Sequence, residues 1–300
     1  MYNSIQFPDR LTHITLADGM VRGLLLTATQ TVTTAAAIHG TSPVATAALG
    51  RTLMATGFLG AMLKSDEASV TVTIDGNGPL GKIVCIGDNN SVRGLVEHPN
   101  VVLPLRPDGK LSVGMAVGNE GRLSVVKDLG LKSPYVGQTS LVSGEIAEDF
   151  ATYYVTSEQQ PTLLSLGVLV NGEHVLSAGG ILLQPLPGCD DKIIEKLEFR
   201  SPMFADISRE LCYEPLLTLV EKWLEDLHPV VLAEKSFQYR CNCTRERMER
   251  ALITLGKEEL TRMIEDEQEG AELHCHFCKK AENFSQKDLA VLLHKAISKN

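Results

Sequence analysis

Two short pairs of cysteines near the C-terminal end constrain this chain more than any other feature of its sequence. Cys241 and Cys243 are separated by one residue, 31 residues follow, and Cys275 and Cys278 enclose two more. Four sulfur ligands in two closely spaced pairs suit a tetrahedral Zn²⁺ ion, with Zn–S distances of about 2.3 Å. We therefore expect one Zn²⁺ per chain, bound by all four cysteines, that closes the long loop between the pairs.

The residues around these cysteines indicate that the metal also stabilises its surroundings. Residues 244–260 have helical composition, but the C-terminal region offers few apolar side chains. Metal binding should then supply a large part of its folding free energy, and we expect the region to unfold without the metal. The side chains available for its small core are Met248, Ala251, Leu252, Leu255 and Leu260.

The residues alone leave the role of this site open between a structural zinc site and a redox switch. Zinc keeps its cysteine ligands as thiolates, which is the form that oxidants attack. Each pair is close enough in sequence to form a local disulfide. The ring between Cys241 and Cys243 would be smaller and more strained than the ring between Cys275 and Cys278.

Other kinds of zinc site fit less well. A catalytic zinc keeps an open coordination position, so His274 or His276 would have to replace a thiolate. A thioredoxin-type enzyme is disfavoured because the second cysteine pair lies outside any βαβ pattern. Residues 231–300 contain twelve basic and twelve acidic side chains, which argues against a nucleic-acid module. A local basic patch could still form from Arg245, Arg247 and Arg250.

Charge and hydropathy narrow the classes of partner. The formal net charge of −9 disfavours nucleic acid as a general partner. Residues 1–10 lack the basic and apolar pattern of an export signal, so we expect a cytoplasmic protein. Residues 42–64 are apolar but carry Arg51 and fall short of the roughly 18 uninterrupted apolar residues of a membrane helix. They predict a buried helix, with Ser42 as its N-cap and Pro43 at its first position, and no membrane partner.

No catalytic pattern is readable outside the zinc site. The motifs of the common serine hydrolases, P-loop NTPases and zincins do not occur in the sequence. Residues 76–81, GNGPLG, match a dinucleotide-binding pattern, but an extended run follows instead of a helix, which predicts a turn between paired strands. We therefore do not expect an enzyme. Structural or surface roles are expected for the isolated residues Cys85, Cys189, Cys212, His13, His39, His98 and His174.

Periodicity and charge density predict three parts. Residues 1–185 read as an α+β domain with a mixed, largely antiparallel sheet, residues 186–229 as a helical linker, and residues 230–300 as a small zinc-binding domain. Expected strands cover residues 69–74, 82–86 and 163–170, and expected helices cover residues 29–39, 42–63 and 145–158. Hairpin turns are expected at the pairs Asp75-Gly76, Asp108-Gly109 and Asn171-Gly172.

The linker carries one apolar helical face that needs a covering surface. A segment of this length cannot form a core of its own, so we expect it to pack on the sheet domain in the resting protein. If the face is later uncovered, it becomes a candidate surface for binding other proteins. It consists of Leu216, Leu217, Val220, Trp223, Leu224 and Leu227.

Several motifs, taken together, resemble one family, the redox-regulated 33-kilodalton heat-shock chaperones of bacteria. The first cysteine pair is followed by TRER at residues 244–247, and the second pair encloses His276 and Phe277. The likeness extends over essentially the whole chain. Further similar stretches are TAALGR (46–51), DGNGPLG (75–81), LSVVKDLG (123–130), SGEIAED (143–149), SEQ (157–159), AGG (178–180) and LPG (186–188).

The resemblance implies an ATP-independent holdase chaperone with a substrate-binding domain, a linker and a zinc-bound sensor. In such a protein, oxidation and heat release the zinc and form disulfides between Cys241 and Cys243 and between Cys275 and Cys278. The sensor and linker then unfold, and the protein, as a homodimer, binds unfolded client proteins. The chain departs from the family pattern at Asn242, in place of a common proline, and at Glu282, in place of an aromatic residue. Two alternatives remain, a constitutive zinc-stabilised binding protein and a thiol oxidoreductase.

Overall fold

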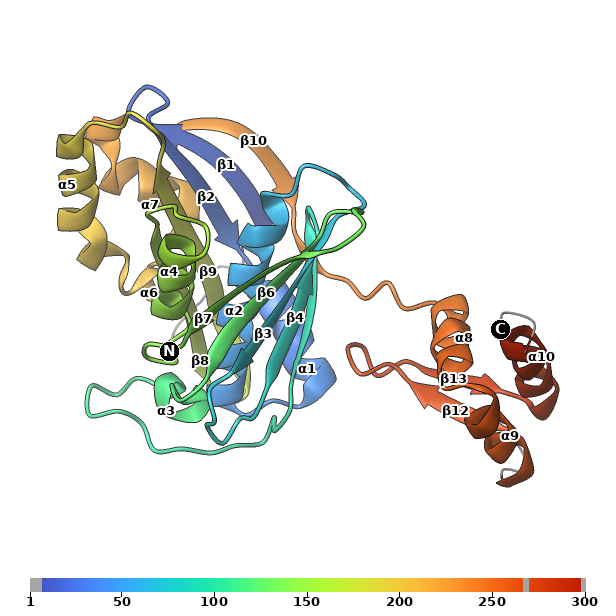
Figure 1. The fold of residues 1–300 in the computed structure, drawn as a ribbon. Helices are drawn as coiled ribbons and strands as arrows, with labels where there is room; N and C mark the ends of the chain where they lie inside the picture. Colours follow the sequence, from blue (N-terminus) through green and yellow to red (C-terminus); the bar gives the residue numbers. More distant parts are fainter. Residues whose placement is uncertain (1–6, 267–269, 298–300) are drawn as a thin grey trace. The chain divides into compact units, whose positions relative to one another are not determined.

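The computed structural model describes residues 7–266 and 270–297. It contains two compact units, Met1–Arg240 and Cys241–Asn300, which are described separately. The first unit holds both large sheets and most of the helices, and the second holds the four-cysteine region (Figure 1).

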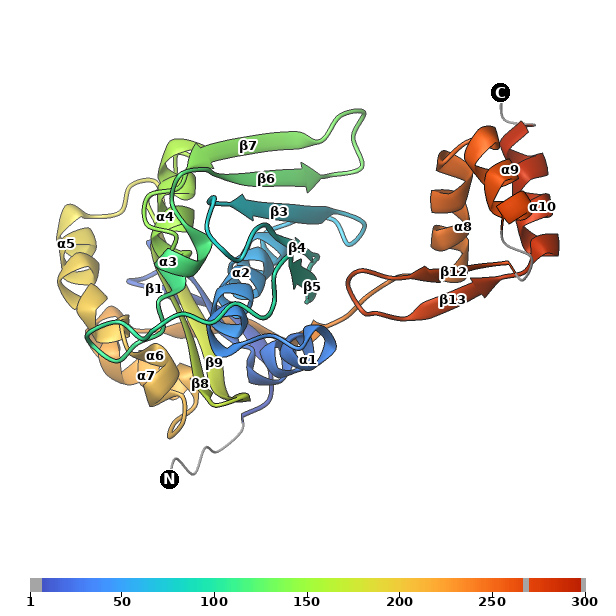
Figure 2. The same cartoon turned by 90° about the horizontal axis from the view of Figure 1, so that it is seen from below.

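The first unit is built around a buried helix that lies between two sheets (Figure 2). The five-stranded sheet is antiparallel throughout and has the order β10-β1-β2-β9-β8. The six-stranded sheet has the order β11-β5-β4-β3-β6-β7, and its one parallel pair joins β11 to β5. The strands are β1 (Arg10–Leu16), β2 (Val21–Thr27), β3 (Ser69–Asp75), β4 (Ile83–Gly87), β5 (Ser91–Val96), β6 (Arg122–Asp128), β7 (Tyr135–Ser140), β8 (Leu163–Asn171), β9 (His174–Pro185), β10 (Val230–Ser236) and β11 (Gln238–Tyr239).

The central helix, α2 (Pro43–Ala61), is the buried helix expected from its composition. The Ser42 hydroxyl caps it by accepting a hydrogen bond from the Ala45 amide. Gly60 permits a close approach, because a Cβ atom there would lie 2.2 Å from the Asp88 carbonyl oxygen. The Arg51 guanidinium leaves the apolar surroundings by pairing with the Glu145 carboxylate at 2.7 Å.

Alternation along the five-stranded sheet explains why its strands are apolar on both faces. In β2, Leu24 and Leu26 face the core around α2, whereas Leu25 faces the opposite side. That opposite side is covered by short helices, as Figure 1 shows. They are α5 (Asp191–Arg200), the 3₁₀ turn η1 (Ser201–Phe204), α6 (Ile207–Glu210), α7 (Leu216–Trp223) and the 3₁₀ turn η2 (Glu225–Leu227).

Three further helices complete the first unit: α1 (Thr29–His39), α3 (Val113–Val117) and α4 (Ala147–Thr156). The turn before α4 depends on the fully buried Asp149. Its carboxylate accepts hydrogen bonds from the backbone N–H groups of Val142 at 2.7 Å, Ser143 at 3.1 Å and Gly144 at 3.4 Å. It also accepts one at 3.0 Å from Ile146, whose φ of 74° is uncommon for a β-branched residue. One side chain therefore organises the whole turn.

The second unit places three helices around a two-stranded antiparallel sheet. They are α8 (Arg245–Thr254), α9 (Lys257–Asp266), α10 (Gln286–Ile297), β12 (Ala271–His274) and β13 (Ala281–Phe284). Seven buried side chains form its core: Met248, Leu252, Leu260, Ala271, Phe284, Leu289 and Leu292. So small a core is consistent with a need for additional stabilisation.

The α+β class and the largely antiparallel pairing are confirmed, although there are two large sheets where one was expected. The expected turn at Asn171-Gly172 joins β8 to β9, and residues 76–81 lie between the paired strands β3 and β4. The division into parts at residues 185 and 229 stays a prediction. The contact pattern itself divides the chain after Arg240.

Two local predictions were wrong. The turn at Asp108-Gly109 lies in the loop between β5 and α3 and joins no strands, because its turn residues interrupt a loop and not a ladder. Residues 244–260 form parts of two helices, since the chain turns at Gly256, whose φ is 89°. That break leaves Ala251 and Leu255 exposed, so they do not belong to the core.

In the part of the chain that the structure describes, no helix is both long enough and apolar enough to span a membrane.

The Asp149 turn generates a stability prediction. Asp149→Ala leaves buried N–H groups without an acceptor and should lower the free energy of unfolding by about 2–4 kcal/mol. Glu148→Ala removes a neighbouring but exposed carboxylate and should change it by less than about 0.5 kcal/mol. Urea unfolding of the two variants and the parent measures the difference. Equal losses in both variants would contradict the role given to Asp149.

Candidate metal centre

The four cysteines come from two places that flank the core of the second unit. Cys241 and Cys243 lie in the extended segment that leads into α8, whose N-cap Thr244 accepts a hydrogen bond from the Arg247 amide. Cys275 and Cys278 lie in the turn between β12 and β13. Within this turn the Cys275 amide donates to the Lys280 carbonyl oxygen at 2.9 Å, and the Lys279 amide donates to the Cys275 carbonyl oxygen at 2.8 Å. The hairpin thus fixes the spacing of the second pair.

The four sulfur atoms form one cluster. All Sγ atoms lie within 4.8 Å of one another. The Sγ atoms of Cys241 and Cys275 are 3.6 Å apart, and those of Cys243 and Cys278 are 3.3 Å apart. A tetrahedron with Zn–S bonds of about 2.3 Å has S–S edges of about 3.8 Å. The cluster therefore has the donor set and the spacing to hold one tetrahedral metal ion.

The pKa values of the thiols show what the cluster costs without a positive charge. Burial and the neighbouring sulfurs raise the pKa of Cys243, and burial is the main cause that raises the pKa of Cys241. Burial also acts to raise the pKa of Cys275, but hydrogen bonds from the backbone N–H groups of Cys278 and Phe277 outweigh it, so that this pKa is lowered. Four thiolates in this space require a cation to offset their mutual repulsion.

Arg245 connects the elements that carry the two pairs. Its guanidinium lies 4.4 Å from the centre of the Phe284 ring and pairs with Asp288 at 3.0 Å and with Glu282 at 3.7 Å. It also donates to the Asn283 carbonyl oxygen at 2.8 Å. Helix α8, strand β13 and helix α10 are thereby joined behind the cluster, and this arginine is engaged with acidic groups of its own unit.

Both departures from the family pattern are accommodated by charged or polar partners. Asn242 accepts hydrogen bonds from the Arg247 guanidinium through its side-chain and backbone oxygens. Glu282 pairs with Lys280 at 2.6 Å, in addition to its contact with Arg245. Neither side chain belongs to the sulfur cluster.

Other candidate residues are not brought to the cluster. The His274 ring contacts the Glu272 carboxylate at 2.9 Å, and His276 is exposed. Cys85 and Cys212 are buried in the first unit. Burial raises the pKa of Cys85, and partial burial with the adjacent carboxylates raises the pKa of Cys189. These two thiols are therefore poor nucleophiles compared with a thiolate.

The expected apolar face of the linker is largely covered by the five-stranded sheet. Helix α7 packs on β2, and Trp223 meets the Phe204 ring edge-on at a centroid distance of 5.5 Å. Leu217 and Trp223 are half-buried, and the remaining four residues of the face are at most 3% exposed. Leu219, which the helical pattern did not include, is also buried.

Sequence reasoning missed the residues that support the cluster. Arg245 was considered only as part of a basic patch, because its partners Asp288 and Phe284 lie about forty positions away and only the fold brings them together. The Thr244 cap was readable, since a threonine that precedes a charged helical run is a common N-cap.

Comparisons with known proteins agree with this geometry. The model of the Hsp33 protein family matches residues 9–285. The 33 kDa chaperonin of Ruminiclostridium cellulolyticum is 44% identical over 286 residues, covering 94% of this chain and 96% of the relative. That of Acetivibrio thermocellus is 46% identical over 295 residues, covering 95% and 97%.

A solved structure gives the same result for the fold. The crystal structure of the 33 kDa chaperonin (Heat shock protein 33 homolog) from Thermotoga maritima superposes with a TM-score of 0.88 at 34% identity, over 97% of this chain and 100% of that one. With a clustered four-cysteine site and a family match over most of its length, this chain belongs to the Hsp33 family of chaperones.

Proposed function

We propose that this protein is an ATP-independent holdase chaperone that oxidation of a four-cysteine zinc centre switches on. The observation that carries the proposal is the sulfur cluster, in a unit whose own core has only seven buried side chains. When bound, Zn²⁺ supplies the positive charge that lets all four sulfurs remain thiolates. The unit that depends on this charge is therefore sensitive to the chemistry of its ligands.

Oxidation removes the ligands. In each pair, two thiols lose two protons and two electrons to form one S–S bond, and one molecule of hydrogen peroxide is reduced to two molecules of water. A disulfide sulfur is a much weaker metal ligand than a thiolate, so metal affinity and the unit's folding free energy fall together. At rest, a reducing cytoplasm would keep the thiols available for this reaction.

The pairing of the disulfides follows from chain length more than from the folded geometry. In the folded cluster, the Sγ contacts at 3.6 Å and 3.3 Å join one cysteine from each pair. Once the unit unfolds, closing a loop of about 34 residues costs about 2 kcal/mol more than closing a loop of about three. Local bonds between Cys241 and Cys243 and between Cys275 and Cys278 are therefore the proposed products.

Activation then requires apolar surface to become accessible. The face of α7 and the part of the sheet beneath it are covered in the resting protein. We propose that loss of the second unit's structure destabilises the linker, residues 186–229, and that this surface then binds unfolded client proteins, with a homodimer as the active form. The rival function, a constitutive zinc-stabilised binding protein, requires no such change.

Metal content tests the ligand set. The reduced protein should contain one Zn²⁺ per chain. Serine at any of Cys241, Cys243, Cys275 or Cys278 should lower zinc affinity by more than about 100-fold, beyond the loss typical of a residue that only hydrogen-bonds a ligand. Cys189→Ser and His276→Ala are matched controls that should keep full stoichiometry. A colorimetric zinc titration measures each variant, and full affinity in one of the four serine variants would remove that residue from the set.

Mass mapping tests the pairing. Peroxide at mildly elevated temperature should release the zinc and yield the two local disulfides, while Cys85, Cys189 and Cys212 stay reduced because they lack thiolate character. The Cys189→Ser protein should give the same map. A dominant bond between Cys241 and Cys275, or between Cys243 and Cys278, would show that oxidation occurs within the folded cluster and would refute local pairing.

Trp223, the only tryptophan in the chain, reports on activation. Oxidation should shift its emission to longer wavelength as the Phe204 contact is lost, together with zinc release and protection of a heat-unfolding client measured by light scattering. Cys278→Ser, loaded with as little zinc as it retains, should protect the client before any oxidant is added. Full protection by the reduced, zinc-loaded parent, with unchanged Trp223 emission on oxidation, would favour the constitutive binding protein.

A further inference from the structure

The segment directly before Cys241 inserts an aromatic side chain into the main core of the first unit. Phe237 is only 3% exposed and packs in the core around α2. A Cβ atom at Gly57 of α2 would lie 2.7 Å from Phe237 Cζ and 3.3 Å from Leu26 Cδ2. The missing side chain at Gly57 therefore creates the pocket that Phe237 fills.

The next residues cover the edge of the six-stranded sheet. Strand β11 pairs in parallel with the start of β5, and the Arg240 amide donates to the Val92 carbonyl oxygen at 2.9 Å. Beyond this pair, the Tyr239 hydroxyl donates to the Gly94 carbonyl oxygen at 3.0 Å and accepts from the Gly94 amide at 3.4 Å. A tyrosine side chain thus takes the place of main-chain groups, and the exposed edge of β5 is satisfied without a longer strand.

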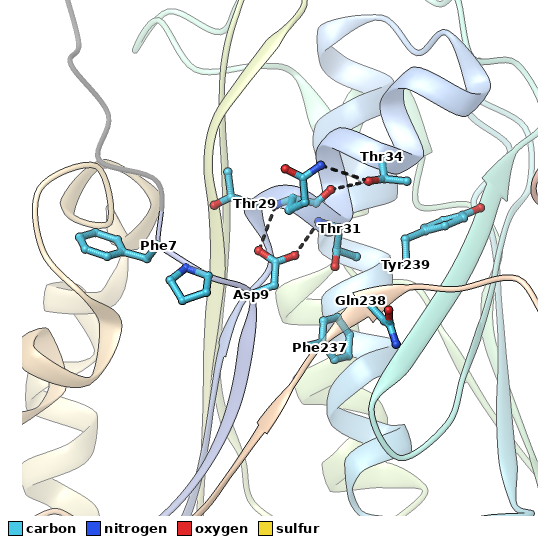
Figure 3. A pocket seen from close by; sticks show the side chains of 10 residues that line it. Phe7, Asp9, Thr29, Thr31, Thr34, Phe237, Gln238 and Tyr239 are labelled. Atoms are coloured by element: carbon cyan, nitrogen blue, oxygen red, sulfur yellow. Dashed lines mark hydrogen bonds between the residues drawn. The ribbon is translucent and has the colours of Figure 1, made fainter.

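A hollow of about 610 Å³ lies beside this segment. Figure 3 shows Phe237, Gln238 and Tyr239 along one wall and the start of α1 along the other. The second wall is held by Asp9, whose carboxylate accepts hydrogen bonds from the backbone N–H groups of Gln30 and Thr31 at 3.0 Å and 2.6 Å. The segment therefore borders open space into which side chains of an extended chain can fit.

Folded structure holds the segment at both ends. Upstream, Ser236 is paired with Arg10 in the five-stranded sheet, and the Phe237 amide donates to the Asp9 carbonyl oxygen at 3.2 Å. Downstream, Arg240 is bonded to the first cysteine of the cluster. If the second unit unfolds, only the upstream attachment remains, and a strand held at one end frays from its free end. The Arg240 end is thus the first to leave.

We propose that residues 237–240 are an internal occupant of a client-binding groove, and that after activation the edge of β5 and the pocket over Gly57 bind an extended client segment carrying an aromatic side chain. The inference rests on the proposed holdase function and specifies one of its binding surfaces. Addition of a strand to a sheet edge uses main-chain hydrogen bonds and so accepts many sequences, while the pocket adds a preference for an aromatic residue. Both properties suit a chaperone with diverse clients.

The occupant's chemistry is inferred from the segment itself. It is extended, it places one aromatic ring in the pocket, and three residues later Arg240 pairs with the Asp88 carboxylate at 3.4 Å. A client segment with an aromatic residue followed at the third position by a basic one should therefore bind best. Opposite charge at that third position should weaken binding.

A fluorescent peptide with the sequence of residues 234–240, EKSFQYR, is the probe. It should bind the peroxide-oxidised full chain at least about tenfold more tightly than the reduced, zinc-loaded chain, as measured by fluorescence anisotropy. Exchange of the peptide's phenylalanine for alanine should weaken binding to the oxidised chain by about tenfold or more. Because these changes are made in the peptide, they are independent of how protein variants fold.

Two matched glycine variants locate the pocket on α2. Gly57→Ala should weaken peptide binding to the oxidised chain by about tenfold, since the added methyl group occupies the site of the ring. Gly50→Ala adds a methyl group to the same helix, 2.9 Å from Val168 and Val32 side-chain atoms, and should leave the affinity unchanged. Phe237→Ala should raise peptide binding by the reduced chain without changing that of the oxidised chain.

Competition connects the groove to clients. Reduced and carboxymethylated α-lactalbumin, a permanently unfolded protein, should displace the peptide from the oxidised chain. Peptide binding that is indifferent to the phenylalanine exchange overturns the inference. So does a failure of displacement while the oxidised chain still suppresses client aggregation, in which case the holdase function stands and its binding surface lies elsewhere. If the oxidised chain suppresses no aggregation, the proposed function itself fails.

Discussion

Four sulfur atoms held within 4.8 Å of one another are the constraint on which the second unit depends. Without a cation, their proximity opposes ionisation and raises the pKa of Cys241 and Cys243, mainly through burial. With a divalent cation, the same proximity becomes a source of folding free energy. The unit therefore stores much of its stability in one place, and that place is chemically labile because its ligands are nucleophilic thiolates.

The first unit is stabilised in a different way. Its central helix is buried on all sides between two sheets, and the five-stranded sheet is covered on both faces. Loss of a metal removes nothing from this core directly. A protein that must expose binding surface while remaining folded benefits from this division, since one part can unfold while the other keeps its shape.

The residues between the two units belong structurally to the first. Strand β10 extends the five-stranded sheet, and Phe237 enters the core around α2 just before the chain reaches Cys241. Chemistry at the cysteines and packing in the large core are therefore separated by only a few covalent bonds. This short connection allows a local loss of structure to free a sheet edge and an apolar pocket without unfolding the core.

The sequence by itself determined the ligand set, the buried helix after Ser42 and the α+β class, because each depends on local signals: cysteine spacing, a cap followed by an apolar run, and alternating strands. It did not determine that there are two large sheets, nor that Gly256 divides the helical region into α8 and α9. The bridging role of Arg245 and the insertion of Phe237 over Gly57 join residues about 40 and 180 positions apart. Such contacts were decided only by the tertiary structure, because packing depends on which surfaces meet in space, and local periodicity carries no record of that.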